Sequence, residues 1–439
     1  MLCAPGGVNY ENWSGHSNLQ LRLDNVIGAI ANNMMKTISI INQPINNRGD
    51  QAAHKSFVKL LSDNGFDVNV LFIGNKENYY PFCKGISGAK YQYFAKRVRG
   101  IGTILKQLSR YPALFKLSRF LPGYKDFMQH IRESDLVVCA PGGVCMGPYK
   151  SWSHLINLDI ALSNNGNVAI WGRSIGPFID KTPSDKLFFE KSKEILRQVG
   201  FISLRDLSSQ NILSSMGLDY IPTLDTAFAN TPEVDLPQEL SYLQDEKYIV
   251  FVPNELYAWH PIFKKTNHQK MDSLYLDIAR KITSLGYKIV MLPQLFNRGT
   301  KGDYYYFRNL ESQSDLPGIK VISEEFDCDI QQAIIRNAKA VVGARYHSII
   351  FAINNLIPFL CLSYEQKMHY TLRMLHLDSY SVDLKDIVEN NKKDVVYAKI
   401  ESIIEQNEQI RTVLHKQRDV ARNILSDAFD EFLKYSSNI

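Results

Sequence analysis

An arginine, a histidine and a lysine lie close together in the stretch VVGARYHSIIFAINNLIPFLCLSYEQKMH. Arg345 and His347 follow a short apolar run that ends at Gly343, and Lys367 follows a second run that ends at Ser363. Such runs indicate buried strands, and an open α/β sheet binds its ligands at the carboxyl ends of its strands. Helical periodicity begins just after the histidine, and a helix N-terminus favours an anion. Two cations and a titratable imidazole at this edge predict a site for a phosphorylated or carboxylated small molecule.

Polar loops also follow apolar runs in the first half of the chain. Asn47, Gly49 and Asp50 in NNRGDQAA follow the first predicted strand. Glycine allows a tight turn there, and the aspartate either caps the next helix or acts as a base. Gly142 and Gly143 in APGGVCMG allow a ligand to approach the backbone closely, although this motif is also common in ordinary loops.

Two further arginines stand at strand ends. Arg173 and Ser174 in GRSIGPF offer a pair of hydrogen-bond donors, with an ordinary surface arginine as the alternative. Arg205 in SLRD ends another strand, and Asp206 is the expected N-cap of the next helix. Asp50 and Asp225 are candidates to position the hydroxyls of a substrate.

The segments that position these loops alternate between strands and helices. Strands are predicted at 37–42, 68–73, 135–140, 167–171, 201–204, 248–253, 287–292, 319–322, 340–342 and 357–362. Intervening helices of ten or so residues favour parallel sheets with crossover connections. We therefore predict an α/β fold with two Rossmann-like domains whose parallel sheets face a central cleft.

The domain boundaries follow from composition. A polar, proline-bearing stretch at 232–247 separates the two series of strands, and a charged segment with apolar periodicity closes the chain. CAPGGV at 3–8 recurs at 139–144, which suggests a partial duplication. The predicted parts are an N-terminal extension at 1–36, domains at 37–235 and 236–390, and C-terminal helices at 391–439, which we expect to pack across both domains.

Composition narrows the function classes. The chain has 439 residues and a formal net charge of +5, which alone does not indicate nucleic-acid binding. Six scattered cysteines lack metal-ligand spacing and indicate a reducing, cytoplasmic compartment. We find no signal peptide and no run long enough to span a bilayer. The absence of GxSxG, GxxxxGK[ST] and GxGxxG motifs argues against the usual α/β hydrolases, P-loop enzymes and dinucleotide oxidoreductases.

The motifs, taken in order, resemble those of the polysaccharide pyruvyl transferases. They are NNRGDQAA, APGGVCMG, GRSIGPF, SLRD and GARYHSIIFAINNLIPFLCLSYEQKMH, and the last is long and specific. The resemblance implies a GT-B-like fold and transfer of pyruvate from phosphoenolpyruvate onto two sugar hydroxyls to form a cyclic ketal. It implies neither a metal nor a cofactor. The donor-site arginine, histidine and lysine of the family correspond to Arg205, His347 and Lys367.

The chemistry of the residues agrees with that implication. Phosphoenolpyruvate carries a phosphate and a carboxylate, which arginine binds with two prongs and lysine with a mobile charge. We predict His347 as the general acid, with Arg205 and Lys367 holding the donor. Arg345, Gly343, Ser363, Arg173 and Ser174 are predicted to line the donor site. Asn47, Gly49, Asp50, Gly142 and Gly143 are predicted to line the acceptor site.

A basic segment extends from residue 90 to residue 125. It contains nine lysines and arginines, interleaved aromatic residues and no acidic residue. Such a segment suits an anionic membrane surface, and a solvated helical hairpin is the alternative. The family's acceptor is often a glycan on a polyprenyl diphosphate, so we expect peripheral contact with the inner face of the cytoplasmic membrane. No nucleic-acid motif accompanies the basic residues.

Two other classes of function stay open at this level. The first is a GT-B nucleotide-sugar glycosyltransferase, which would require a sugar-nucleotide site. The second is a non-catalytic subunit of a polysaccharide assembly system, against which the arginine, histidine and lysine set argues.

Overall fold

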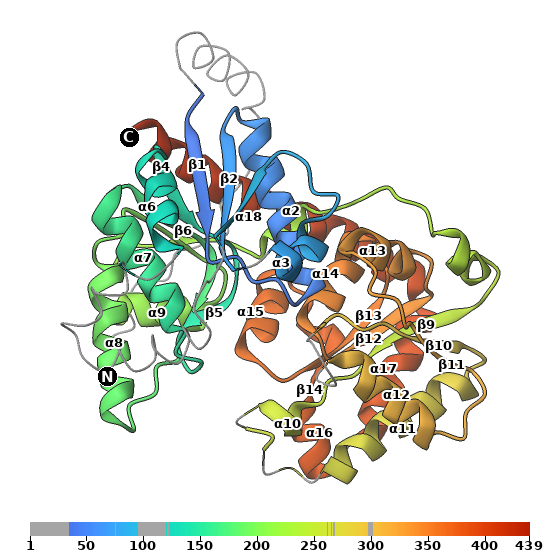
Figure 1. The fold of residues 1–439 in the computed structure, drawn as a ribbon. Coiled ribbons are helices and arrows are strands. Elements are labelled where there is room, and N and C mark those ends of the chain that lie inside the picture. Colours follow the sequence, from blue (N-terminus) through green and yellow to red (C-terminus); the bar gives the residue numbers. More distant parts are fainter. Residues whose placement is uncertain are drawn as a thin grey trace.

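Two entirely parallel sheets form the centre of the molecule (Figure 1). The computed structural model describes residues 35–74, 76–94, 120, 123–260, 262–264, 266, 268–296 and 302–439. The first sheet has eight strands in the order β3-β2-β1-β4-β6-β7-β8, with β5 beside β6. The second has six strands in the order β11-β10-β9-β12-β13-β14. The predicted α/β fold with two Rossmann-like units is confirmed.

Helices connect successive strands of the first sheet. Its strands are β1 (Thr37–Ile41), β2 (Asp67–Ile73), β3 (Lys90–Phe94), β4 (Leu136–Cys139), β5 (Gly142–Met146), β6 (Val168–Ile175), β7 (Phe201–Leu204) and β8 (Ile221–Pro222). Its helices are α2 (Arg48–Asp63), α3 (Lys76–Cys83), α6 (Tyr124–Arg132), α7 (Trp152–Asn164), α8 (Pro183–Leu196) and α9 (Leu207–Ser215). Asp206 is the N-cap of α9, as predicted, and its side chain accepts a hydrogen bond from the backbone N–H of Ser209.

The second sheet follows two short 3-10 helices, η3 (Thr226–Ala229) and η4 (Gln238–Gln244). Its strands are β9 (Tyr248–Val252), β10 (Lys288–Met291), β11 (Ile319–Val321), β12 (Ala340–Gly343), β13 (Phe359–Ser363) and β14 (Ser381–Asp383). Its helices are α10 (Leu256–Trp259), α11 (His268–Ser284), α12 (Asp303–Gln313), α13 (Cys328–Arg336), α14 (Tyr346–Asn354), α15 (Gln366–Met374), η5 (Asp378–Tyr380), α16 (Leu384–Asn390) and α17 (Lys393–Glu405).

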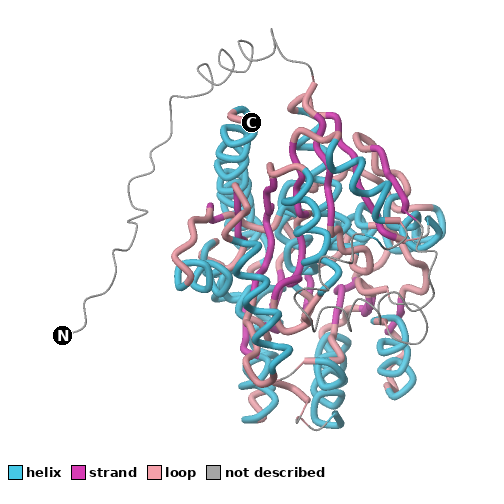
Figure 2. Tube along the Cα trace, turned by 60° about the vertical axis from the view of Figure 1, so that its left-hand side comes forward, coloured by secondary structure: helices cyan, strands magenta, loops and turns pink. Residues whose placement is uncertain are grey.

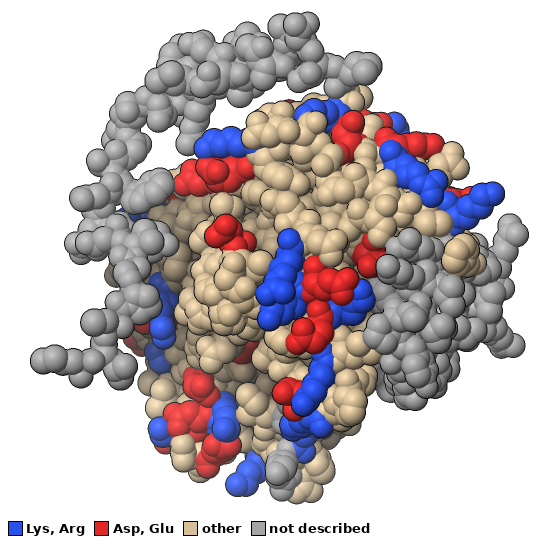
Figure 3. Space-filling model, turned by 90° about the vertical axis from the view of Figure 1, so that its left-hand side faces the viewer, with Lys and Arg blue, Asp and Glu red and all other residues tan. Residues whose placement is uncertain are grey.

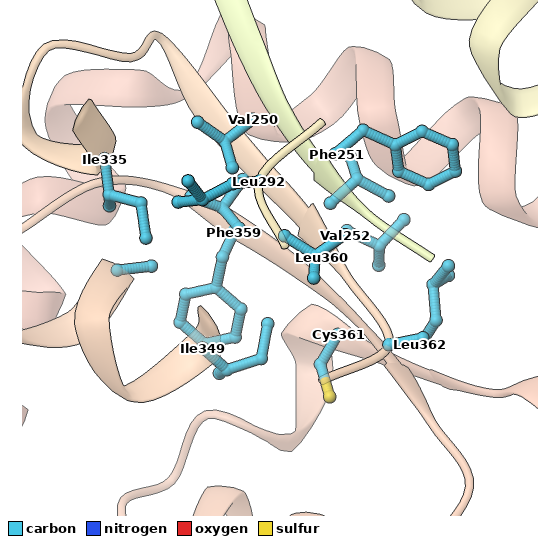
Figure 4. Packing of buried hydrophobic residues seen from close by; sticks show 14 of the residues in the cluster. Val250, Phe251, Val252, Leu292, Ile335, Ile349, Phe359, Leu360, Cys361 and Leu362 are labelled. Atoms are coloured by element: carbon cyan, nitrogen blue, oxygen red, sulfur yellow. The ribbon is translucent and has the colours of Figure 1, made fainter. Parts of the chain in front are cut away.

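The central strands of the second sheet are buried on both faces. Every residue of β9, β12 and β13 is buried, which explains why these strands read as continuous apolar runs rather than as alternating patterns. Ile349 of α14 and Ile335 of α13 pack beside Val250, Phe359 and their neighbours (Figure 4). This rigid layer fixes the ends of β12 and β13, from which the predicted site residues emerge.

The last helix, α18 (Asn407–Ser437), extends from the second sheet to the first (Figures 1 and 2). The Asn407 side chain donates a hydrogen bond to the carbonyl of Lys339, just before β12. Near its other end, Phe429 and Phe432 pack edge-on against Trp171 of β6, with ring centroids 5.6 Å away in each case. The helix therefore contributes to the cores of both units.

The N-terminal end of α2 contacts the second unit directly. The buried Arg48 side chain donates to the carbonyl of Phe326 at 2.8 Å, pairs with Glu325 at 2.6 Å and lies over the Phe296 ring. Asn47 forms an isolated antiparallel bridge with Leu295. The loop that carries Asn47, Gly49 and Asp50 is thereby held against the unit that carries His347.

The strands missed in the sequence include β3, β5 and β14. The PGGV segment, predicted as a loop, forms β5 beside β6. Residues 90–94, assigned to the basic segment, form the edge strand β3, on which Tyr91 and Tyr93 stack against Phe72. The part of the basic segment at 95–119 and the repeat at 3–8 lie outside the described residues. Within the described chain, no helix is both long and apolar enough to cross a membrane.

Candidate active site

Arg205 and His347 meet on one carboxylate, that of Asp225. Arg205 follows β7 of the first sheet, and His347 lies in the first turn of α14, after β12 of the second sheet. The Arg205 Nη1 donates to Oδ2 of Asp225, and the His347 Nε2 lies 3.5 Å from the same oxygen. Two predicted donor-site residues from different sheets are therefore brought together by a third residue.

Asp225 is fully buried, with none of its side chain exposed. It is the N-cap of η3, and its Oδ1 accepts a hydrogen bond from the Ala227 N–H at 3.0 Å. Burial alone would raise the pKa of Asp225, but the Arg205 charge and then His347 outweigh it, so the pKa lies below its usual value. The suggestion that Asp225 positions sugar hydroxyls is wrong, because protein groups occupy this carboxylate.

Arg205 is almost completely enclosed, with 2% of its side chain exposed. Its Nε donates to the Ser174 hydroxyl at 3.1 Å, and its guanidinium lies 5.7 Å from the centre of the Tyr346 ring. Burial acts to lower the pKa of Arg205, but the adjacent Asp225 charge reverses the direction and raises it. Ser174 therefore orients Arg205 by accepting its hydrogen bond.

The His347 ring packs directly against the backbone of Gly49. A Cβ at residue 49 would lie 1.7 Å from Cγ of the imidazole and 2.0 Å from Nδ1. Since α2 belongs to the first sheet, this contact places the start of that helix against the histidine of the second unit. Glycine is required here for close approach, a stronger reason than the tight turn expected from the sequence.

Asn47, rather than Asp50, caps α2. Its side chain accepts a hydrogen bond from the Gly49 N–H at 2.7 Å. Asp50 lies half-buried in the first helical turn, and its Oδ1 is 3.4 Å from the position that a Cβ on Gly142 would take. Of the predicted acceptor residues, Gly49 contacts His347, Asp50 follows it in α2 and lies beside Gly142, and Gly143 has open space beside its Cα.

Lys367 lies in the first turn of α15, where a surface turn was expected. Its ammonium pairs with Glu365 at 2.6 Å and lies 5.6 Å from the centre of the Tyr346 ring. Burial would raise the pKa of Glu365, but the charges of Lys367, His260 and Arg345 lower it overall. Arg205 and Lys367 are therefore both within cation–π range of one ring, that of Tyr346.

Arg345 forms an ion pair with Asp303, and its side chain is 11% exposed. The other oxygen of Asp303 accepts hydrogen bonds from the backbone N–H groups of Gln294 and Leu295. Burial acts to lower the pKa of Arg345, and the Asp303 charge more than compensates, so the pKa is raised. This arrangement holds the loop after β10 against the loop after β12.

The remaining donor-site predictions have mixed outcomes. Arg173 Nη1 donates to the backbone carbonyls of Asn42 and Ala140, so this buried residue ties the loop after β1 to that after β4. Gly343 packs on Ser348, whose Oγ would be 2.3 Å from an added Cβ. The Ser363 hydroxyl is fully buried at the end of β13 and has no hydrogen-bond partner in the described part of the chain.

Three of the four predicted cations thus have their own carboxylate: Arg205 has Asp225, Arg345 has Asp303, and Lys367 has Glu365. Within these three pairs the charges cancel, and a protonated His347 adds one positive charge. The sequence-based expectation of a strongly cationic site is therefore too simple. Among the described residues, no group of three or more His, Cys, Asp or Glu side chains is placed to hold a metal ion.

The comparisons with known proteins agree on one fold. A family model described as polysaccharide pyruvyl transferase matches residues 47–366. A Glycyrrhiza uralensis UGT73P12 structure with glycyrrhetinic acid 3-O-monoglucuronide has a TM-score of 0.57 at 11% identity, covering 92% of this chain and 96% of that one. A UDP-GlcNAc 2-epimerase from Neisseria meningitidis bound to UDP-GlcNAc has a TM-score of 0.56 at 10% identity, covering 92% and 100%.

A glycosyltransferase structure from Rickettsia africae gives the same result, with a TM-score of 0.56 at 11% identity over 92% of this chain and 99% of that one. No curated protein sequence matches. At these identities, the likeness to solved structures establishes the GT-B architecture alone.

Proposed function

The chain belongs to the polysaccharide pyruvyl transferase family, and on this premise we propose that it transfers pyruvate from phosphoenolpyruvate to a polysaccharide precursor. The product is a cyclic ketal on two hydroxyls of one sugar. The observation that supports this proposal most strongly is the meeting of Arg205 and His347, from two different sheets, on the buried Asp225 carboxylate. Such a geometry joins an anion-binding group to a proton-transfer group.

Arg205 and Lys367 hold the donor in this proposal. Arg205 uses Nη1 for Asp225 and Nε for Ser174, which leaves Nη2 to bind a carboxylate or phosphate oxygen. Lys367 is more exposed and exchanges Glu365 for the donor phosphate. Arg345 supports the adjoining loops through Asp303.

The reaction needs one proton on carbon. The His347 imidazolium gives a proton to the methylene carbon of phosphoenolpyruvate, and a cationic centre forms at the neighbouring carbon. A sugar hydroxyl forms a bond to that centre and loses its proton, and the C–O bond to phosphate then breaks. A second hydroxyl closes the ring. Overall, one hydroxyl proton goes to carbon and the other leaves with phosphate.

The acceptor sugar binds beside the N-terminal end of α2. Gly49 lies against the imidazole, and Asp50, the next residue, lies beside Gly142. The carboxylate of Asp50 accepts a hydrogen bond from a sugar hydroxyl in this proposal. The first sheet then carries the acceptor site and contributes Arg205 to the donor site, while the second sheet contributes His347 and Lys367.

The acceptor is a glycan on a polyprenyl diphosphate, met at the inner face of the cytoplasmic membrane. The basic segment at 90–125 provides the contact in this proposal, although Lys90 itself pairs with Asp67 across the sheet edge. On the face in Figure 3, basic and acidic side chains are interspersed, so the described surface there offers no large basic area. Flotation with anionic liposomes at low salt tests the contact, and recovery of the protein only at the bottom of the gradient would refute it.

The catalytic assignment is tested by His347→Gln. Phosphate release is measured with phosphoenolpyruvate and a panel of glycosides bearing neighbouring diols, and the ketal methyl group is detected by NMR. We expect turnover to fall by about 10²- to 10⁴-fold. His415→Gln is the matched control, since His415 is exposed on α18. Near-normal turnover of the His347 variant would remove this residue from the mechanism.

A further inference from the structure

We propose that Asp225 is a positioning residue: it holds the Nε2–H of His347, so that the imidazole exchanges protons with the reactants through Nδ1. This inference rests on the proposed function, because it assigns the working nitrogen of the proposed general acid. It also gives a structural reason for the glycine at position 49.

The burial of the two ring nitrogens differs. Nε2 is fully buried and has no hydrogen-bond partner in the described structure, and the nearest carboxylate oxygen is Oδ2 of Asp225 at 3.5 Å. A reactant has no path to a buried nitrogen, yet 8% of the His347 side chain remains exposed. Proton exchange therefore falls to the other edge of the ring, which carries Nδ1.

The Nδ1 edge faces the proposed acceptor side. A Cβ on Gly49 would lie 2.0 Å from Nδ1, so the side of the ring that carries Nδ1 packs against the N-terminal end of α2. Asp50 is the next residue in the helix, and Gly142 lies against its carboxylate. The proton-exchanging nitrogen is thus adjacent to the group that receives a sugar hydroxyl in the proposed reaction.

Asp225 is itself fixed by two groups besides His347. The Arg205 guanidinium and the Ala227 N–H hold its two oxygens, and its backbone begins η3. A carboxylate fixed in this way selects one tautomer of the neutral ring and stabilises the imidazolium. A distance of 3.5 Å is long for a hydrogen bond, and such contacts often tighten only when substrate binds.

Several charged or titratable groups surround this cluster and set the background for any pH effect. Asp50 approaches from α2, Asp206 from α9 and Arg205 from the end of β7. Arg345 and Tyr346 precede the histidine in sequence, and the Lys367 ammonium lies 5.6 Å from the centre of the Tyr346 ring. Among these groups, Asp225 is the only carboxylate within 4 Å of the imidazole in the described structure.

The tautomer is measured first, without any substrate. Long-range ¹H–¹⁵N correlation spectra of ¹⁵N-histidine protein assign His347 by its absence in the His347→Gln variant. We expect the neutral ring to carry its proton on Nε2. A proton on Nδ1, or an even mixture of tautomers, would overturn the inference. Because this spectrum needs no turnover, it separates a failure of the inference from a failure of the proposed pyruvyl transfer.

The kinetics of the Asp225→Asn variant then measure how much the Asp225 carboxylate contributes to turnover. We expect kcat to fall on the order of 10³-fold, with a smaller change in KM for phosphoenolpyruvate. The limb of the kcat profile that falls with rising pH moves to lower pH, because the imidazolium loses its negative neighbour. Asp225→Glu restores part of the activity by returning the charge.

The matched control is Asp206→Asn. Asp206 is also buried and next to Arg205, but it caps α9, a role that asparagine fills equally well. The pH profile of kcat for the Asp206→Asn variant is expected to match that of the unmodified protein. An Asp225→Asn profile that keeps its shape while only the amount of folded protein falls would assign Asp225 a structural role and overturn the inference.

Discussion

The Arg205–Asp225 and Lys367–Glu365 pairs have the same chemistry but very different surroundings. In the first pair, 2% and 0% of the two side chains are exposed, whereas the second retains 28% and 21%. The first pair also gains hydrogen bonds from Ser174 and Ala227. A buried pair with additional hydrogen bonds fixes geometry, while a pair at the rim can exchange one partner for a ligand. The site therefore combines a rigid arginine with a movable lysine.

The largest expected effect is a difference in stability between variants of the two ion pairs. Arg205→Leu leaves the buried Asp225 without its main counter-charge, and we expect the free energy of unfolding to fall by about 3–5 kcal/mol. Lys367→Met breaks a partly exposed pair and is expected to cost less than about 1 kcal/mol. Urea unfolding of both variants measures the difference. Equal losses would show that burial does not distinguish the pairs.

An intermediate effect is expected on the stability of the protein at acid pH. The pKa of Asp225 lies below its ordinary value of 3.8, so its stabilising contribution is present above that pH and is lost as pH falls further. Asp225→Asn is therefore expected to be less stable than the unmodified protein at about pH 7, and the gap should narrow at about pH 3. Glu365→Gln should show the same trend with a smaller amplitude, because the pair at the rim is better solvated. Urea midpoints at the two pH values test both statements, and a gap that widens in acid would contradict the sign.

The smallest expected effect concerns the donor. Glu365→Gln removes the carboxylate that competes with the donor for Lys367, and KM for phosphoenolpyruvate is expected to fall about two- to fivefold. Lys367→Met should raise the same KM. Initial-rate kinetics at neutral pH measure both. A higher KM in the Glu365 variant would mean that the ion pair orients the lysine for binding instead of competing for it.

Apolar runs in the sequence predicted most of the strands. Strands such as β7, β9 and β12 are buried on both faces, so they stand in the sequence as continuous apolar runs. The edge strand β3 was missed because its residues were assigned to the basic segment at 90–125. Yet Tyr91 and Tyr93 alternate as strand residues do, and this signal could have revealed it. The short β5 lies in a glycine-rich segment, which reads as a loop in any sequence.

The cations of the site could be predicted, but their partners could not. Arg205 and His347 follow strand ends, so the place of each at the carboxyl edge of its own sheet was predictable from topology. Asp225 comes from a loop between the two sheets and Asp303 from the start of α12, and no local pattern links either one to its arginine. The contact between Gly49 and His347 depends on how the two units pack, which periodicity does not encode. Glu365 was the accessible clue, since it stands two residues from Lys367.

The path of α18 affects the order in which the molecule can be completed. Phe429 and Phe432 seal the core around Trp171, yet a ribosome synthesises them only after the whole second sheet. The first unit therefore emerges with an open apolar face and must wait for more than two hundred residues of later chain, a count that runs from the end of β8 at Pro222 to Phe429. Nascent chains halted after β8 should accordingly recruit chaperones at this face until the closing helix arrives.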